Sequence, residues 1–178
     1  ADTLLRVESA LTQGLPANEL TAHPSHAEFP GEVSANTSRI SRSVSIDGNQ
    51  SGLPGNFGYS SAGAHLRMTT GLYAAPGDVV TVTLPASLVD SGAYVLVGAH
   101  SDSLWGKSQL HRHPQIVRWW YVDETTMEVG NAFGGPIYIA IQAGSTLGEF
   151  DVTISNAVKA PRYIHGETNL FQWLEQYR

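Results

Sequence analysis

Short strand-like runs, separated by turn residues, occupy the middle of the chain, and they limit the fold more than any other feature of the sequence. In these runs, β-branched and aromatic residues alternate with polar ones, and Gly, Pro, Asn and Asp stand between them. We predict strands at residues 40–46, 79–84, 94–99, 116–122, 127–129, 137–141 and 150–154. Because no helical periodicity separates them, the pattern predicts an all-β fold, a β-sandwich or jelly-roll-like arrangement.

The two ends of the chain have helical periodicity instead. Residues 2–13 place apolar side chains at helical spacing, and Gly14 and Pro16 then end the pattern. Residues 167–178 show the same spacing, with an Asn and a Gln placed as in a capping box. We therefore predict a short N-terminal helix and a C-terminal helix.

These patterns divide the chain into three parts. Residues 1–35 are predicted to form the N-terminal helix and a linker, and residues 36–158 the β-sandwich. Residues 159–178 are predicted to form a helix that leads into a following domain. Within the sandwich, the glycine-rich segment 48–63 is expected to be a surface loop.

Charge and composition exclude several classes of function. The chain of 178 residues has 16 acidic and 10 basic residues, a net charge of −6, so a nucleic-acid partner is not expected. The absence of cysteine excludes disulfides, zinc–cysteine sites and thiol catalysis. No run of apolar residues is long enough to predict a membrane span.

Histidines raise the possibility of a metal site. His100 with Asp102, and His111 with His113, are two positions apart, so on a strand the members of each pair share a face. These residues also fit turns and exposed loops, and we expect no metal ion here. The motifs H-E-x-x-H, G-x-S-x-G and G-x-x-x-x-G-K-[ST] are absent, so we expect no enzymatic activity from this chain itself.

Aromatic residues concentrate near the third and fourth predicted strands. Trp105, Trp119, Trp120 and Tyr121 lie close together in sequence with basic residues among them, a composition that suits sugar stacking or peptide binding. Core packing is the alternative, and alternation places Trp119 and Trp120 on opposite faces of a strand. The candidate glycan-binding residues are Trp105, Lys107, Arg112 and Trp119.

Four motifs in fixed order resemble a known domain. They are TGLYAAPGD at 70–78, VGAHSD at 97–102 followed by Leu104 and Trp105, RHP at 112–114, and NAFGGPIYI at 131–139. In this order they resemble the N-terminal β-sandwich domain of the enhancin-like zinc metallopeptidases. That family includes viral enhancins and bacterial enzymes that act on mucins and other glycoproteins.

The resemblance implies a non-catalytic accessory domain that supports a zinc catalytic domain after residue 178 and helps to present its substrate. Zinc would then belong to that catalytic domain, and no catalytic residue can be assigned here. The implied partners are the catalytic domain and a glycan or glycoprotein, and the implied location is secreted or on the cell surface, of bacterial type. Structural roles are implied for Gly71, Tyr73, Pro76, Gly77, Asp102, Pro114, Gly134 and Gly135, with Gly71 and Gly77 framing one turn.

Two alternatives stay open at this point. One is a stand-alone carbohydrate-binding module that uses the aromatic segment from Trp105 to Tyr121. The other is a metal-dependent β-barrel enzyme that uses His100, Asp102, His111 and His113.

Overall fold

The structure is a computed structural model that describes residues 2–50 and 64–176. Its described residues form eight strands that pair antiparallel throughout. The strands are β1 (Arg39–Asn49), β2 (Leu66–Ala74), β3 (Val80–Thr83), β4 (Tyr94–Val97), β5 (Arg118–Tyr121), β6 (Thr126–Val129), β7 (Gly135–Ile141) and β8 (Thr146–Lys159). The all-β fold predicted from the sequence is confirmed.

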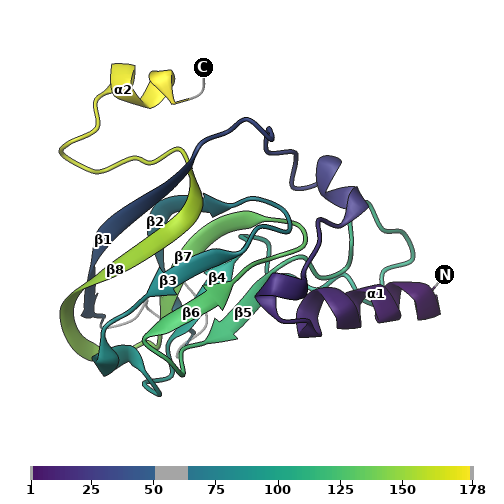
Figure 1. Cartoon of the computed structure of the whole chain (residues 1–178), viewed down its shortest axis with the longest axis horizontal. Helices are drawn as coiled ribbons and strands as arrows, with labels where there is room; N and C mark the ends of the chain where they lie inside the picture. Colours follow the sequence, from purple (N-terminus) through teal and green to yellow (C-terminus); the bar gives the residue numbers. More distant parts are fainter. Residues whose placement is uncertain (1, 51–63, 177–178) are drawn as a thin grey trace.

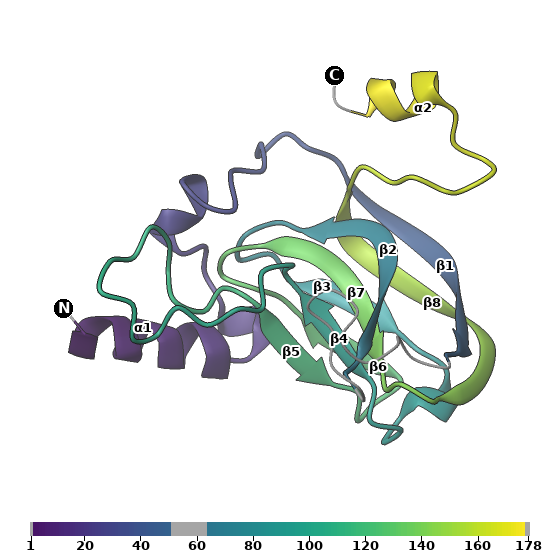
Figure 2. The ribbon, with the colours of Figure 1, turned by 180° about the vertical axis from the view of Figure 1, so that it is seen from behind.

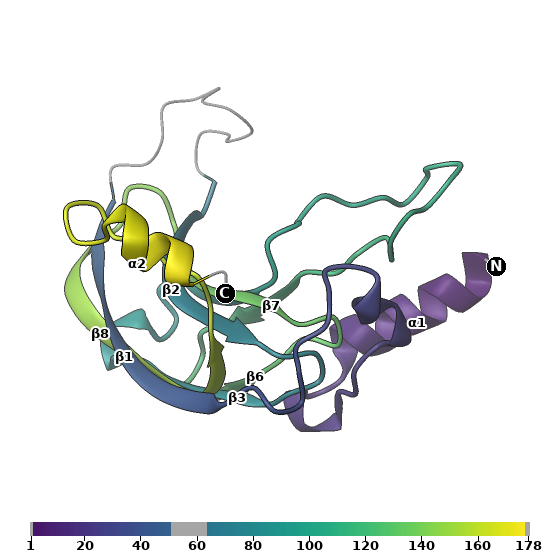
Figure 3. The same ribbon diagram turned by 90° about the horizontal axis from the view of Figure 1, so that it is seen from above.

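The strands form two layers of one folded sheet (Figures 1 and 3). The order β5-β4-β7-β2 makes one layer, and β1-β8-β3-β6 makes the other. The layers join where Leu72 and Tyr73 of β2 pair with the end of β8. Alternate residues of both layers point inward and form a single core cluster, because successive side chains on a strand face opposite ways. That cluster includes Val44, Ile46, Leu72, Val82, Val95, Val97, Ile137, Ile139, Val152 and Ile154.

Strand β2 is absent from the strands predicted by sequence, and the residues at its centre explain why. The register between β2 and β7 shifts between Thr69 and Tyr73. Gly71 lies at this bulge with a φ of 69°, a conformation that glycine adopts without strain. The shift inserts two residues, so burial still alternates along β2. The inward position at its centre is the polar Thr70, however, and Gly71 follows it, so the apolar pattern that would mark a strand is interrupted there. The expectation that Gly71 frames a turn with Gly77 was therefore wrong, because Gly71 lies inside β2.

The ends of the predicted strands also differ from the structure. Strand β8 is longer than the predicted 150–154, because β1 pairs with it from Thr146 to Val158. Of the predicted surface loop 48–63, Gly48 belongs to β1, and residues 51–63 lie outside the described part of the chain.

The N-terminal segment, residues 2–31, packs on the β5 end of the sandwich. It contains α1 (Asp2–Gly14) and two short 3₁₀ turns, Ala17–Glu19 and Pro24–Ala27, and Figure 2 shows it beside β5. The guanidinium of Arg118 donates to the carbonyl oxygens of Thr12 and Leu15, at the C-terminus of α1. A cation is favourable there because helix carbonyls end with partial negative charge.

Arg118 is itself held by an aromatic ring. Its guanidinium carbon lies 3.7 Å from the ring centroid of Trp120, which suits a cation–π contact. Burial lowers the pKa of Arg118 to about 10, so the side chain remains charged at neutral pH. The C-terminus of α1 is thus anchored to the sandwich by one buried cation.

The C-terminal helix α2 (Leu170–Glu175) is shorter than predicted and begins with the expected capping box between Asn169 and Gln172. None of its residues is buried, and Figures 1 and 2 show it apart from the two layers. A cleft of about 770 Å³ separates it from Arg42 and Lys159 on β1 and β8. Among the described residues, no helix is long and apolar enough to cross a membrane.

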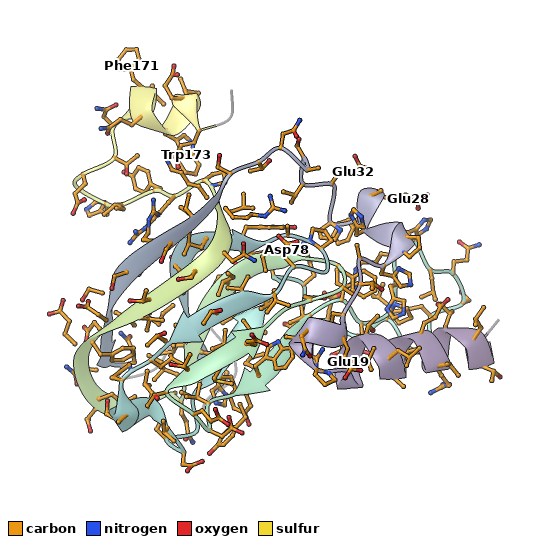
Figure 4. The ribbon with its side chains drawn as sticks, in the orientation of Figure 1. Glu19, Glu28, Glu32, Asp78, Phe171 and Trp173 are labelled. Atoms are coloured by element: carbon orange, nitrogen blue, oxygen red, sulfur yellow. The ribbon has the colours of Figure 1, made fainter. Side chains whose placement is uncertain are left out.

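The apolar side chains of α2 face different ways. Phe171 is 80% exposed and points away from the sandwich in Figure 4, whereas Trp173 lies on the side nearer to it. The Trp173 ring contacts that of Tyr163, with centroids 6.0 Å apart. The helix therefore packs on its own lead-in segment.

The side chain of Asn131 is a fully buried polar centre of the fold. Its Nδ2 donates to the carbonyl oxygens of Val97 and Ile116, at 2.9 and 2.8 Å, and its Oδ1 accepts from the backbone N–H of Phe133 at 3.0 Å. Asn131 thus joins the end of β4, the segment before β5 and the turn before β7.

The backbone of Asn131 extends the same network. Its carbonyl oxygen accepts from the N–H groups of Gly77 and Gly134, both at 3.0 Å. Beside it, a Cβ atom on Gly135 would lie only 2.5 Å from the Cα atom of Gly98, so glycine permits this close approach of two chains. Three of the four motifs that carry the family resemblance therefore meet in one place.

We expect Asn131→Ala to lower the free energy of unfolding by about 3–5 kcal/mol, because it leaves two buried carbonyl groups and one buried N–H without partners. Urea unfolding measures the change. The control is Asn36→Ala at an exposed position, which should change stability by less than about 0.5 kcal/mol. A loss below about 1 kcal/mol for Asn131→Ala would contradict this role.

Candidate functional site

The outer face of the layer β5-β4-β7-β2 carries two rows of paired side chains. Paired residues on neighbouring strands point to the same side of a sheet. Since Val95 and Val97 of β4 point into the core, Tyr94 and Leu96 point outward. The two rows are Thr69–Tyr138–Leu96–Trp119 and Arg67–Ala140–Tyr94–Tyr121.

Aromatic rings dominate this surface, which we call the outer aromatic face: His65, Arg67, Tyr94, Trp119, Tyr121 and Tyr138. Tyr94 lies at its centre, with ring centroids 5.7 Å from Trp119, 5.4 Å from Tyr121 and 5.2 Å from His65. All three contacts are edge-to-face, a favourable geometry. Trp119 is 39% exposed and Tyr121 is 40% exposed, whereas Tyr94 and Tyr138 are half-buried. The exposed part of the surface therefore lies at the β5 edge.

Polar groups border these rings. The Arg67 guanidinium lies 5.6 Å from the ring centroid of Trp119 and donates to Ala99 and Ser101. Desolvation raises the pKa of Tyr138, and desolvation followed by the charge of Asp90 raises that of Tyr121. Both phenols are therefore neutral at physiological pH and can donate hydrogen bonds. The surface combines flat apolar rings with hydrogen-bond donors.

The predicted glycan-binding residues do not form one site. Trp119 belongs to the outer aromatic face, whereas Trp105 lies against α1, where the Arg6 guanidinium is 4.9 Å from its ring centroid. Lys107 is exposed on the loop that follows Trp105. The loop and α1 lie near each other in Figure 2.

Arg112, also predicted to bind glycan, is engaged within the same loop. Its guanidinium donates to the carboxylate of Asp102 at 2.7 Å and to the carbonyl oxygen of His113 at 2.9 Å. Asp102 therefore ties the start of the loop to its end, close to the buried Pro114. This pairing gives Arg112 a structural role within the loop.

The histidines proposed as metal ligands are likewise not brought together as a set. His100 and His111 are exposed, and Asp102 pairs with Arg112. Within residues 2–50 and 64–176, the one group with ligand atoms close enough to hold a metal joins His113 to Glu8 and His23. Sequence spacing did not suggest that group, because its members come from three distant segments.

The sequence also did not identify several residues of the outer aromatic face. These residues come from three strands or their flanks: His65 directly precedes β2 and Arg67 lies in it, Tyr94 lies in β4, and Tyr138 lies in β7. Alternation indicates that such residues point outward, but it does not specify which strands are neighbours. Trp119 and Trp120 do lie on opposite faces of β5, since Trp120 packs against the core and donates to Gly130.

These features define an all-β sandwich domain with an exposed aromatic face. Sequence comparison then identifies its family: residues 36–155 match the N-terminal domain of M60-like peptidases. Because this match covers nearly all of the sandwich and most of the chain, the chain belongs to that family. At this level the resemblance found in the sequence is confirmed.

Several animal proteins are similar to this chain in sequence. It is 38% identical over 135 residues to a TRPM8 channel-associated factor homolog of Xenopus laevis, which covers 76% of this chain and 14% of that protein. It is 35% identical over 106 residues to TRPM8 channel-associated factor 1 of Homo sapiens, covering 60% and 12%. The chain thus spans less than one sixth of the length of these relatives.

Two solved structures have a similar fold. The IMPa metallopeptidase from Pseudomonas aeruginosa matches with a TM-score of 0.55 and 16% identity, over 88% of this chain and 17% of that one. The catalytic module of the metalloprotease ZmpA from Clostridium perfringens matches with a TM-score of 0.50 and 14% identity, over 75% and 28%. At these identities the likeness shows the fold alone.

The orientation of the two neighbouring indoles can be tested by fluorescence. The emission of each indole is the difference between the parent protein and the variant that lacks it, Trp119→Phe or Trp120→Phe. We expect acrylamide to quench the emission of Trp119 more strongly than that of Trp120, because Trp119 is the more exposed. Quenching of the two variants and the parent protein measures this difference. Stronger quenching of the Trp120 component would contradict the placement of β5.

Proposed function

We propose that this domain is a non-catalytic accessory module of an M60-like peptidase, in which it binds glycan chains of glycoproteins and helps to present them to a catalytic domain. Membership of the N-terminal M60-like family supports the accessory role. The sequence lacks H-E-x-x-H, so in this proposal the peptidase reaction, and its zinc, belong to another domain of the protein. Such a protein would meet its substrates outside the cell or at the cell surface.

The outer aromatic face is the observation that carries the glycan-binding part of the proposal. Trp119 and Tyr121 present exposed rings that can stack on the apolar face of a pyranose. The hydroxyls of Tyr94 and Tyr138 supply donors for sugar hydroxyl or carboxylate oxygens, and the Arg67 guanidinium keeps further N–H groups beside the two that donate to Ala99 and Ser101. An extended sheet face can accept several sugar rings in a row, so the fitting ligand is a neutral or acidic oligosaccharide.

The surface around Trp105, Lys107 and Arg112 is a less favourable location for the same ligand. Trp105 packs against α1, and Arg112 already pairs with Asp102. Of its predicted residues, Lys107 alone would offer an unengaged donor on an exposed loop. We therefore assign the primary site to the outer aromatic face.

Helix α2 supports the proposed contact with a catalytic domain. Its apolar residues Leu170, Phe171 and Leu174 are 68%, 80% and 48% exposed. Exposed apolar side chains on a capped helix are typical of an interface with another domain. In the proposed arrangement, this helix lies between the sandwich and the catalytic domain.

A second candidate function follows from the named relatives. Proteins called TRPM8 channel-associated factors are up to 38% identical to this chain, so a role in binding a partner protein is the main alternative. A stand-alone carbohydrate-binding module would use the same aromatic face. Binding of a free glycan, without an attached peptide, would favour a sugar site over a protein-binding site.

Weak glycan binding is expected from an open site with few stacking contacts, with a Kd between about 0.1 and a few millimolar. Titration with mucin-type O-glycans, followed by two-dimensional NMR, should shift the resonances of Tyr94, Trp119 and Tyr121. Trp119→Ala should weaken binding by about tenfold, since one stacking contact is lost.

Trp105→Ala is the matched control for this titration and should bind like the parent protein. Loss of binding in Trp105→Ala with none in Trp119→Ala would move the site to the loop. No shifts with any glycan at millimolar concentration would remove the glycan-binding proposal.

The proposed role of α2 is tested by Phe171→Ala in two proteins. In this chain the free energy of unfolding should change by less than about 0.5 kcal/mol, because the side chain is exposed. In a longer protein that includes the catalytic domain, the loss should approach about 3 kcal/mol. Leu4→Ala, an exposed apolar position on α1, is the control in both. Equal effects of Phe171→Ala in both proteins would contradict an interface at α2.

A further inference from the structure

Three potential metal ligands meet where the N-terminal segment packs on the sandwich. Glu8 comes from α1, His23 precedes the second 3₁₀ turn, and His113 comes from the loop before β5. One ligand atom of each residue lies within 4.8 Å of those of the other two. The two imidazole rings also pack on Phe133, with centroid distances of 4.7 and 4.9 Å, so their positions are fixed.

His113 provides an independent sign that this cluster accommodates a ligand. The residue is only 5% exposed, and its buried Nε2 has no hydrogen-bond partner. The shortest contact of Nδ1 is with the carbonyl oxygen of Gln115, at 3.0 Å, which assigns the proton to Nδ1. A buried nitrogen lone pair without a partner is costly, and a metal ion would satisfy it.

His23 presents its Nε2 to the cluster. Its Nδ1 lies 2.8 Å from the hydroxyl oxygen of Ser25 and accepts a hydrogen bond from the backbone N–H of Ser25 at 3.2 Å. Its Nε2 lies 3.9 Å from the carboxylate of Glu8. In metal sites, a histidine ligand commonly donates its second N–H to an oxygen, and at His113 this oxygen is the carbonyl of Gln115.

From this geometry we propose that Glu8, His23 and His113 bind a divalent transition metal ion of the zinc type. Ligands of a tetrahedral zinc ion lie about 3.4 Å apart, so the three atoms must approach by on the order of 1 Å. The side chain of Glu8 is partly exposed and can make most of that movement. The carboxylate contributes negative charge, and the nearby cation Arg112 is paired with Asp102.

A pocket beside the cluster leaves room for a further ligand. It has a volume of about 190 Å³ and is lined by Glu8, Thr12, His23, Pro24 and Ala132, among others. Three protein ligands with one open position would allow water to complete the coordination. The pocket also provides a path for the ion from solvent.

The bound ion would fasten the N-terminal segment to the sandwich. It would link α1, the segment after it and the loop before β5. These parts also meet through the hydrogen bonds of Arg118 and of Gln115 with Gln13. This site differs from the one considered in the sequence, because Glu8, His23 and His113 are separated by 15 and 90 positions. It also revises the expectation that the chain holds no metal.

The test is calorimetric titration of zinc chloride into tag-free, chelator-treated protein, with cobalt absorption as a second readout. We expect one equivalent to bind with a Kd at or below about 1 µM, and saturating zinc to raise Tm by about 5 °C or more. Cobalt should give the intense visible bands of a low-symmetry, four-coordinate site.

Glu8→Gln and His23→Gln should each weaken zinc binding by at least about tenfold. These two residues are only partly buried, so both variants should fold even if His113→Gln does not. His111→Gln, at an exposed position, is the matched control and should bind like the parent protein. Binding weaker than about 100 µM, or binding that Glu8→Gln and His23→Gln leave unchanged, would overturn the proposal.

Discussion

The hydrogen bonds of the buried Asn131 side chain are the interaction on which the arrangement of this domain depends. They hold the end of β4, the segment before β5 and the turn before β7 together. A primary amide suits this position because it offers two donors and one acceptor within a small volume. The surrounding glycines allow the backbones to come close enough for these bonds. This network explains why the family's motifs, distant in sequence, occur together.

Both candidate sites depend on elements that this network positions. On one side, β4 and β5 are held in the register that places Tyr94 opposite Tyr121 and Leu96 opposite Trp119, which forms the outer aromatic face. On the other side, the turn at Ala132 accepts a hydrogen bond from the backbone N–H of His23 and thereby positions the N-terminal segment. One rigid centre thus supports two surfaces with different chemistry, the first proposed to bind sugars and the second proposed to bind a metal ion.

Local sequence patterns predicted where the strands and helices of this fold lie, but they did not predict which strands pair with one another. Alternation identified seven of the strands, and the helix caps were readable at Asn169 and Gln172. Alternation of apolar and polar residues failed to mark β2, because the buried position at its centre is the polar Thr70 and Gly71 follows it. The two candidate sites were harder to predict from the sequence. Tyr138 lies on the same face as Trp119 only because of the strand order, and Glu8 lies near His113 only because α1 packs beside the loop before β5. Spacing along the chain carries no information about either contact.

Intermolecular nuclear Overhauser effects would locate the contact between a glycan and the protein directly. With a mucin-type O-glycopeptide at saturating concentration, we expect effects between protons of the sugar rings and the aromatic protons of Tyr94, Trp119 and Tyr121. Effects that involve Trp105 instead, or peptide protons in place of sugar protons, would contradict the assignment of the outer aromatic face as a glycan-binding surface.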